Sequence, residues 1–254
     1  MKQLEHMDLS FAVRRLPNLL KKIMMLPSMS GKVFVSGGFL RSVITNTEIN
    51  DVDVFTSSKA VAEELANTYL RWAKGNNQFA TNVQYNTPNA ITCRYGDNPV
   101  VQFIHRWTFD KPEDVIASFD FTICSAVIYY SADKWYSDCH DNFYSDLAAK
   151  RLIYMFPTRE EEAGGSLLRI LKYYQKGFRI PLDDYAAVIV RMLRGVDWNK
   201  VSPRDEEQLK FVISGLLREV DPVTDPLHEA HLPNNIDEAR DDRKEPDVNN
   251  EPAF

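Results

Sequence analysis

The stretch Val35–Phe55, VSGGFLRSVITNTEINDVDVF, decides the fold. It starts as the end of a short β-branched strand and is interrupted by Gly37-Gly38, which mark a turn. A helix is predicted from Phe39 to Thr45. The chain then returns as the strand Asp51–Phe55, in which acidic and apolar residues alternate with period two. A strand, a glycine turn, a helix and a returning acidic strand are therefore expected within one short segment.

The glycine turn favours the binding of a phosphate group. Gly37 and Gly38 lack a Cβ atom, so a ligand can approach the backbone closely. The helix that begins there presents free N–H groups and the positive end of its dipole. Arg41, one turn into the helix, can donate charge-assisted hydrogen bonds to phosphate oxygens. A surface salt bridge is the alternative role for Arg41.

The returning strand carries two acids that favour a divalent cation. Asp51 and Asp53 are two residues apart on a strand, so their side chains point to the same face. Neighbouring carboxylates repel unless a cation lies between them, and Mg²⁺ prefers carboxylate and phosphate oxygens. Asp120 opens the predicted strand Asp120–Tyr130 and completes a triad if the two strands are neighbours. A solvated edge for the pair, and a turn or cap for Asp120, are the alternatives.

The remaining pattern predicts an α+β protein with a mixed sheet followed by helices. The alternation of strand-like and helix-like segments ends near Phe156-Pro157, after which the periodicity is helical. We expect a catalytic domain over residues 1–156 and a helical neck over 157–220. Further elements are predicted at Leu9–Met25 with a break at Pro17, Lys32–Ser36, Ser58–Lys74, Asn82–Tyr85, Ala90–Tyr95, Val100–Ile104, Pro112–Ser118, Trp135–Asp138, Gly165–Lys176, Asp183–Arg194 and Arg204–Val220.

The charge of the chain is unevenly distributed. Of the net −6 over 254 residues, −7 lies in residues 221–254, which leaves +1 for residues 1–220. The 221–254 segment is rich in Pro, Asn and acids, and we expect a flexible acidic tail. A nearly neutral body excludes a broadly basic, non-specific nucleic-acid binder. The lack of a long apolar run, the lack of a leader and the three scattered cysteines favour a cytoplasmic protein with no membrane association.

Three segments together resemble the nucleotidyltransferase superfamily that includes DNA polymerase β. The resemblance is to the head and neck of class II poly(A) polymerases and CCA-adding tRNA nucleotidyltransferases. Gly37, Gly38, Arg41, Asp51 and Asp53 fall at the family spacing. Asp120–Ile123 resembles the family segment R-R-D-F-T-I-N, and Leu168–Ile180 resembles R-x-L-R…G-F-x-I. The order agrees over about residues 30–185.

The chain departs from the family at positions that bear on its acceptor. Only Arg169 represents the E-D-x-x-R element that reads the incoming base, because Gly165 and Ser166 stand where its acids would be. Ser118 and Phe119 replace the two arginines before D-F-T, and Ser42 replaces the Asp that usually follows the motif arginine. Only about 40 residues follow the neck before the tail. These departures, with the segment VQFIHRWTFDKPEDVIASFDF, also resemble compact viral and phage-type nucleotidyltransferase-like proteins.

The resemblance implies a metal-dependent transfer of a nucleoside monophosphate from an NTP to an acceptor hydroxyl. Asp51, Asp53 and Asp120 would be the catalytic and metal-binding residues, with Mg²⁺ or Mn²⁺ as cofactor. Gly37, Gly38 and Arg41 would bind the triphosphate. Arg169 and Lys172, with Lys176 on the same helix face, would bind the nucleotide, although a solvated basic face is an equal alternative.

Three functions therefore remain open at the level of sequence. The first is nucleotidyl transfer to an RNA 3′ end, such as that of tRNA, by an RNA-binding enzyme. The second is the same reaction on a protein or small-molecule acceptor. The third is a non-catalytic nucleotide-binding regulatory protein that keeps the fold. Retention of all three acids favours the catalytic alternatives, whereas the missing base-reading acids weaken the first. The sequence leaves the oligomeric state undetermined.

Overall fold

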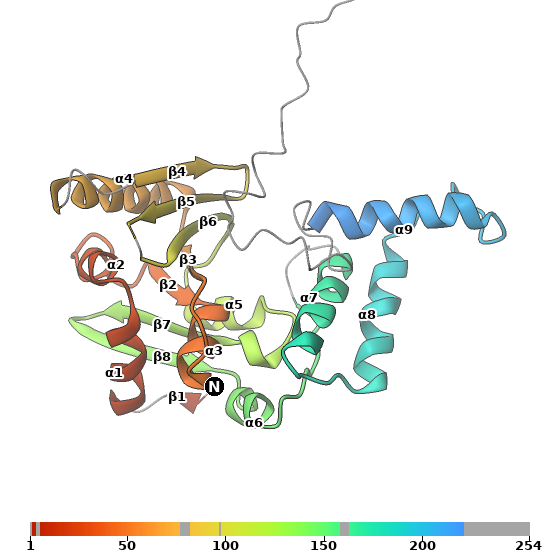
Figure 1. Cartoon of the computed structure of the whole chain (residues 1–254), viewed down its shortest axis with the longest axis horizontal. Coiled ribbons are helices and arrows are strands. Elements are labelled where there is room, and N and C mark those ends of the chain that lie inside the picture. Colours follow the sequence, from red (N-terminus) through yellow and green to blue (C-terminus); the bar gives the residue numbers. More distant parts are fainter. Residues whose placement is uncertain (1, 4–5, 77–81, 97, 158–162, 221–254) are drawn as a thin grey trace, which may run out of the picture. The chain divides into compact units, whose positions relative to one another are not determined.

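The computed structural model describes residues 2–3, 6–76, 82–96, 98–157 and 163–220 (Figure 1). The chain divides into two compact units, with the boundary at about residue 160. The first unit is an α+β domain built on a mixed sheet, and the second is helical. The predicted α+β fold class is thus confirmed. The predicted acidic tail lies outside the described residues.

The first unit is organised around an eight-stranded sheet in the order β1-β8-β7-β2-β3-β6-β5-β4. Among the described strands, β3 and β6 form the one parallel pair, and every other pair is antiparallel. The sheet is therefore mixed, as predicted. The strands are β1 (Lys2–Gln3), β2 (Val33–Ser36), β3 (Asp51–Thr56), β4 (Asn82–Asn86), β5 (Ala90–Tyr95), β6 (Val100–Thr108), β7 (Ala126–Ser131) and β8 (Lys134–Cys139).

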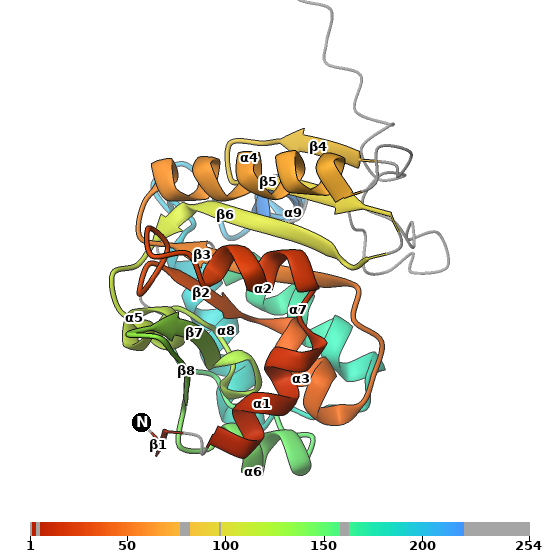
Figure 2. The same ribbon diagram turned by 90° about the vertical axis from the view of Figure 1, so that its left-hand side faces the viewer.

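Helices cover both faces of this sheet (Figures 1 and 2). On one face, Tyr69 of α4 packs against Phe103 of β6. On the other face, Phe55 of β3 contacts Phe119, which follows α5. The helices of the first unit are α1 (His6–Arg15), α2 (Asn18–Met24), α3 (Gly38–Thr45), α4 (Lys59–Asn76), α5 (Pro112–Ala117) and α6 (Phe143–Ala148).

The alternation along β3 determines which side chains reach each face. Val52 and Val54 are fully buried, and Val54 is paired with Phe103, whose ring meets α4. Asp51, Asp53 and Phe55 point to the opposite face. The two acids therefore lie on the face over which the chain passes after α5.

The second unit consists of three described helices, α7 (Ala163–Gln175), α8 (Leu182–Arg194) and α9 (Glu206–Val220). Both α8 and α9 pack against α7. The start of α8 follows the expected signals, with Pro181 before the first turn and acids Asp183 and Asp184 within it. Within the described residues, no helix combines the length and apolar character needed to cross a lipid bilayer.

One predicted strand needs correction, and two short elements were not predicted. The predicted strand Asp120–Tyr130 starts late: Thr122–Cys124 form a 3₁₀ turn, named η1, and β7 starts at Ala126. That strand lies beside β2, so β2 separates it from β3. The sequence also gave no prediction for the short helix α6 or for the two-residue strand β1.

Candidate active site

The site is built where β2 ends, α3 begins and β3 begins. Because β2 and β3 are antiparallel neighbours, with Ser36 opposite Asp53, the end of β2 meets the start of β3 at one edge of the sheet. Gly37 lies between β2 and α3 with φ 76° and ψ −143°, a conformation that favours glycine. The N-cap position of α3 is Gly37, which has no side chain to cap the helix. The first N–H groups of α3 are thus suited to an anion.

Gly37 is also the residue over which the carboxylate of Asp53 lies. A Cβ atom built at position 37 would stand 2.7 Å from Asp53 Oδ2, closer than any real contact. From the sequence alone, the space left by the missing side chain of Gly37 was expected to let a phosphate approach the backbone. In the structure the missing side chain of Gly37 first makes room for the carboxylate of Asp53. The glycine therefore determines the position of a candidate metal ligand.

Asp51 and Asp53 are both partly exposed, in contrast to the fully buried valines that alternate with them. They share a face of β3 with Phe55, whose ring meets that of Phe119 edge-on at 5.9 Å. The residue after Phe119 is Asp120. The chain segment that carries Asp120 thus crosses the same face of the sheet as the two acids, although β7 is not a neighbour of β3.

Arg41 joins α3 to this segment. Its side chain is only 8% exposed, and Nη1 lies 3.7 Å from the sulfur of Cys124 in η1. A Cβ atom at Gly38 would stand 3.3 Å from Arg41 Nη2. The guanidinium therefore lies against the second glycine and reaches the 3₁₀ turn. Gly37 and Gly38 thus each leave space for a charged side chain of the candidate site.

Asp120 is 1% exposed, and its segment is fixed by the chain that leaves the first unit. The backbone N–H of Met155 donates to the Asp120 carbonyl oxygen at 2.8 Å, and Thr122 N–H donates to Ile153 O at 3.1 Å. Across the described residues, no three His, Cys, Asp or Glu side chains are gathered as a metal-binding group. The structure thus gathers Asp53, Gly37, Gly38 and Arg41 and buries Asp120, but among the described residues the predicted triad of Asp51, Asp53 and Asp120 does not form a metal-binding group.

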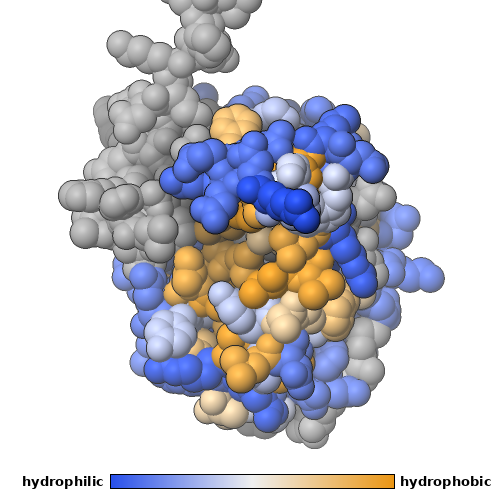
Figure 3. Space-filling model, turned by 90° about the vertical axis from the view of Figure 1, so that its right-hand side faces the viewer, coloured by the Kyte–Doolittle hydropathy of each residue, from blue (hydrophilic) through white to orange (hydrophobic). Residues whose placement is uncertain are grey.

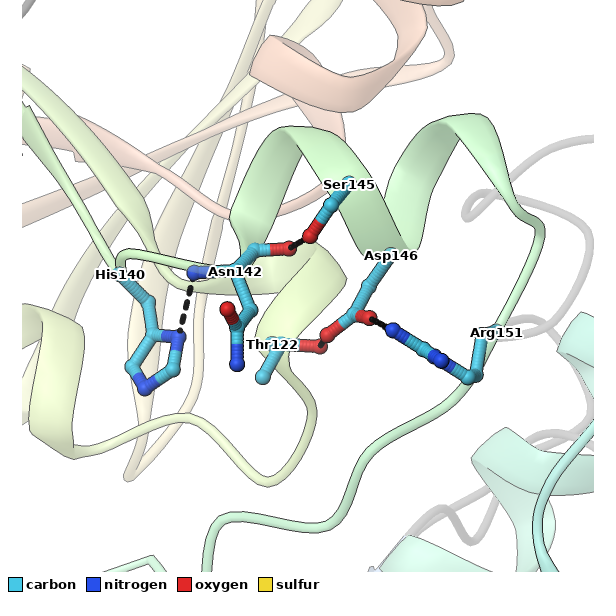
Figure 4. A network of polar contacts seen from close by, with 6 residues as sticks. All are labelled: Thr122, His140, Asn142, Ser145, Asp146 and Arg151. Carbon is cyan, nitrogen blue, oxygen red and sulfur yellow. Dashed lines mark hydrogen bonds and ion pairs between the residues drawn. The ribbon is translucent and has the colours of Figure 1, made fainter.

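A buried network behind η1 was missed by the sequence argument (Figure 4). Asp146 of α6 is fully buried and accepts a hydrogen bond from Thr122 Oγ1 at 2.7 Å. Arg151 donates to the other oxygen of Asp146 through Nε at 2.9 Å and Nη2 at 2.6 Å. The Asp146 carboxylate therefore holds η1 against α6. Thr122 and Asp146 are 24 residues apart in the sequence, so no local pattern indicates that they form a hydrogen bond.

The predicted basic residues of the neck lie in the second unit. Arg169 and Lys172 are on α7, where Arg169 is partly exposed and Lys172 is exposed. Near the end of this helix, the guanidinium carbon of Arg179 lies 4.3 Å from the centre of the Tyr174 ring, a cation–π contact. The nucleotide-binding role of Arg169 and Lys172 stays a prediction.

The fold is similar to that of CCA-adding enzymes. The chain shares 17% identity with the Thermotoga maritima CCA-adding enzyme solved with tRNA, with a TM-score of 0.52 over 86% of this chain and 51% of that one. A CCA-adding enzyme solved with CTP gives 16% identity and a TM-score of 0.53 over 86% and 53%. The chain therefore has the nucleotidyltransferase fold and spans about half the length of these enzymes.

The chain is similar in sequence to a protein of a Bacillus phage. The chain is 24% identical over 159 residues to "Gabija anti-defense 2" of Bacillus phage SPbetaL7. The matched region makes up 63% of this chain and 37% of that protein. Residues 12–150, which include most of the first unit and the whole candidate site around Gly37 and Asp53, match the pattern of "Gad2: Gabija anti-defense 2 family protein". The chain belongs to the Gabija anti-defense 2 family.

Proposed function

We propose that the protein is a metal-dependent nucleotidyltransferase that moves a nucleoside monophosphate from an NTP to an acceptor hydroxyl. One observation carries the proposal: two partly exposed carboxylates, Asp51 and Asp53, lie beside the N-terminus of α3, whose cap position is Gly37 and whose first residue is Gly38. Carboxylates and free N–H groups are the two partners that a metal-bound triphosphate needs. The nucleotidyltransferase fold supports the same reaction.

The donor set fits a magnesium or manganese ion. Mg²⁺ is usually held by one or two carboxylates, with phosphate oxygens and waters completing its shell. Asp51 and Asp53 would supply the two carboxylates, and their position on one strand face supports this role. When bound, the ion would polarise the α-phosphate and lower the pKa of the acceptor hydroxyl. We also propose as a further ligand Asp120, whose segment passes over the same face of the sheet as the two acids.

The side chains and backbone then position the triphosphate for in-line attack. The N–H groups at the start of α3 would donate to its terminal phosphates, while Arg41 keeps the glycine turn and η1 together. The acceptor oxygen forms a bond to the α-phosphorus, and the bond from the α-phosphorus to the bridging oxygen breaks. Pyrophosphate leaves with the electron pair, and the hydroxyl proton passes to solvent.

The first acceptor we propose is an RNA 3′ end. The support is the shared fold with enzymes solved in complex with tRNA and with CTP. Basic residues of α7, Arg169 and Lys172, would contact the nucleotide or the RNA. The nearly neutral charge of residues 1–220 favours an acceptor recognised by a few specific contacts over non-specific RNA binding.

The second acceptor we propose is a hydroxyl on a protein of a Gabija defence system. Membership of the Gabija anti-defense 2 family supports this alternative, because such a family would act against a component of that defence. Covalent nucleotidylation of a defence protein is one way in which a transferase would block it. The absence of base-reading acids at Gly165 and Ser166 also suits an acceptor other than tRNA.

A labelling experiment separates these proposals. The full chain is incubated with each α-³²P-labelled NTP, Mg²⁺ or Mn²⁺, total RNA and purified Gabija proteins. We expect label on RNA or on a Gabija protein, and none when the label is at the γ position, because pyrophosphate leaves. Asp51→Asn/Asp53→Asn removes the metal ligands, whereas Glu48→Gln changes an exposed acid of the preceding loop and serves as the matched control.

The outcomes are distinct. Label on RNA identifies the first acceptor and label on protein identifies the second. Transfer should fall by at least about a hundredfold in the Asp51/Asp53 variant and stay near wild type in Glu48→Gln. Equal incorporation by wild type and the double variant, on every acceptor and with every NTP, contradicts the catalytic proposal.

A further inference from the structure

Helix α8 presents an apolar face that the other described helices leave exposed. Its buried side is formed by Val188 and Met192, which are 0% and 7% exposed. A second apolar row follows helical spacing on another side, and its exposure reaches 82% at Leu182 and 48% at Val190. We name this row the α8 stripe; it consists of Leu182, Tyr185, Ala186, Ile189, Val190 and Leu193.

The arrangement of the second unit explains why the stripe is uncovered. Helices α8 and α9 both pack on α7, and α9 does not cover the exposed side of α8. Phe211 of α9 is 80% exposed, and together with Leu182 it has the largest exposure among the large apolar side chains of the described residues. Figure 3 shows an apolar area of this kind, bordered by hydrophilic side chains. Exposed apolar patches of this kind mark interaction sites.

We propose that the α8 stripe binds the α8 stripe of a second copy of this chain, antiparallel, around a two-fold axis. The order of residues on α8 is self-complementary about the midpoint between Ala187 and Val188. Reversal of the helix about that point places Leu182 opposite Leu193. The same reversal places Tyr185 opposite Val190 and Ala186 opposite Ile189. A two-fold interface requires this property, because the same patch must meet itself.

The charges beside the stripe support the same orientation. Asp183 and Arg194 are eleven residues apart, about three helical turns, so they lie along one edge of the stripe. In the antiparallel pair, Asp183 of one copy lies within about 3 Å along the axis of Arg194 in the other. Two equivalent ion pairs result. A parallel two-fold pair would put this edge of the two helices on opposite sides of the interface, so it would form neither ion pair.

The composition of the stripe disfavours other occupants. It contains no cation that would meet a phosphate backbone. It also lacks the basic flanks at both ends that anionic lipids attract, because its N-terminal end carries Asp183. The small side chain of Ala186 near the two-fold axis allows two helices to approach closely. Dimerisation is independent of the proposed transferase activity, since the stripe shares no residue with the site around Asp53.

A charge exchange tests the proposal. The mass of the full chain is measured by sedimentation or light scattering between about 1 and 100 µM, with circular dichroism to verify folding. We expect a species of twice the 29.2 kDa chain mass at the higher concentrations. Asp183→Arg alone, and Arg194→Asp alone, should each raise the dimer Kd by at least about tenfold, because each places like charges together. The double variant should return to within about threefold of wild type.

Two further variants complete the test. Ala186→Glu places a charge in the apolar centre and should abolish the dimer, whereas Glu64→Arg, at an exposed position of α4, should leave it unchanged. A single 29.2 kDa species at every concentration overturns the proposal. A dimer that resists Ala186→Glu, or that the double exchange fails to restore, overturns it as well.

Discussion

Position 37 requires glycine for two separate reasons, its backbone conformation and its contact with Asp53. The backbone has φ 76°, and the carboxylate of Asp53 occupies the place of a side chain. The sequence indicated the importance of this glycine through its position between a strand and a helix. It could not indicate that the space belongs to Asp53, because that contact depends on the pairing of β2 with β3.

We predict that Gly37→Ala lowers both stability and nucleotidyl transfer. An alanine held at φ 76° and ψ −143°, a backbone region that favours glycine, costs about 1–3 kcal/mol, and its methyl group would push Asp53 away from its position. The matched control is Gly75→Ala in α4, where no atom lies within 4 Å of the added methyl group. That change should be neutral or stabilising by up to about 1 kcal/mol. Chemical denaturation and the labelling assay measure the two effects; a Gly37→Ala protein as stable and active as Gly75→Ala would contradict the prediction.

Asp138 on β8 gives a prediction about pH. Burial raises the pKa of its carboxyl above the usual value, against the opposing effect of a hydrogen bond from Tyr129 Oη at 3.2 Å. A raised carboxyl pKa means that ionised Asp138 opposes folding, so its cost appears as pH rises through that pKa. We therefore expect Asp138→Asn to raise the unfolding midpoint at pH 7. The difference should vanish near pH 3, where Asp138 is protonated in both states.

Thermal unfolding of both proteins between pH 3 and pH 8 measures this effect. Asn keeps an oxygen that accepts from Tyr129, so the comparison isolates the charge. Asp114→Asn on α5, at an exposed position, is the control and should leave the pH dependence of the midpoint unchanged. A midpoint difference that is constant with pH would refute the assignment.

At the scale of elements, η1 depends on α6. The buried carboxylate of Asp146 accepts hydrogen bonds from the Thr122 hydroxyl and the Arg151 guanidinium. Asp146 is the one charged residue of α6. The turn that follows Asp120 is thus held by a short helix that the sequence did not predict. Short helices of one or two turns carry too few residues for a periodic signal.

We predict that Asp146→Ala destabilises the first unit by about 2–3 kcal/mol, because it leaves the buried Thr122 hydroxyl unpaired. Asp146→Asn keeps one acceptor oxygen, which can serve Thr122 or the half-exposed Arg151 but not both, so a loss smaller than that of Asp146→Ala is expected. Denaturant unfolding gives both values. If Ala and Asn variants lose equal stability, the hydrogen bond to Thr122 has no measurable role.

Elements with a strong local signal were predictable from the sequence. The strands β2, β3, β5 and β6, the helix break at Pro17 and the three neck helices all follow from periodicity and breaking residues. The segment 120–130 was wrong in part because its apolar composition does not distinguish a strand from a 3₁₀ turn. The order of strands in the sheet was also beyond local patterns: the sequence left open whether β7 is a neighbour of β3, and β7 lies beside β2.

The candidate site was predictable in its residues more than in its contacts. The spacing of glycines and acids indicated Gly37, Gly38, Arg41 and Asp53, and the structure gathers these four. The burial of Arg41 and its approach to Cys124 follow from the packing of α3 on η1. Arg41 and Cys124 are 83 positions apart in the sequence, so no local sequence pattern could predict their contact.

For the whole molecule, the uneven charge gives a prediction. Removal of residues 221–254 takes away −7 and leaves a body of net charge +1. We expect the shortened protein to bind a polyanionic RNA more tightly at low salt, because repulsion is removed. The gain should disappear at about 0.5 M salt, where the charges are screened. Transfer to a small or uncharged acceptor should be unchanged.

Filter-binding and labelling assays at about 0.05 and 0.5 M salt measure these effects. A chain in which the ten acids of the tail are replaced by their amides is a second variant, since it removes the negative charges, leaves the three bases Arg240, Arg243 and Lys244, and keeps the length. Equal RNA affinity of the full and shortened chains at low salt would show that the tail charge has no effect on binding.

The pairing of β1 with β8 sets a limit on how the protein folds during synthesis. Lys2 lies opposite Cys139, so β1 is joined to the sheet by β8, the last described strand of the first unit. The parallel pair β3 and β6 likewise joins Asp51 to Val100 across α4 and two intervening strands. At roughly 5–20 residues per second, the ribosome needs about 7–27 s between Lys2 and Cys139 and about 2–10 s between Asp51 and Val100. Until then, the N-terminal segment has no strand to bind, and this nascent stage is when we expect chaperones or proteases to encounter it.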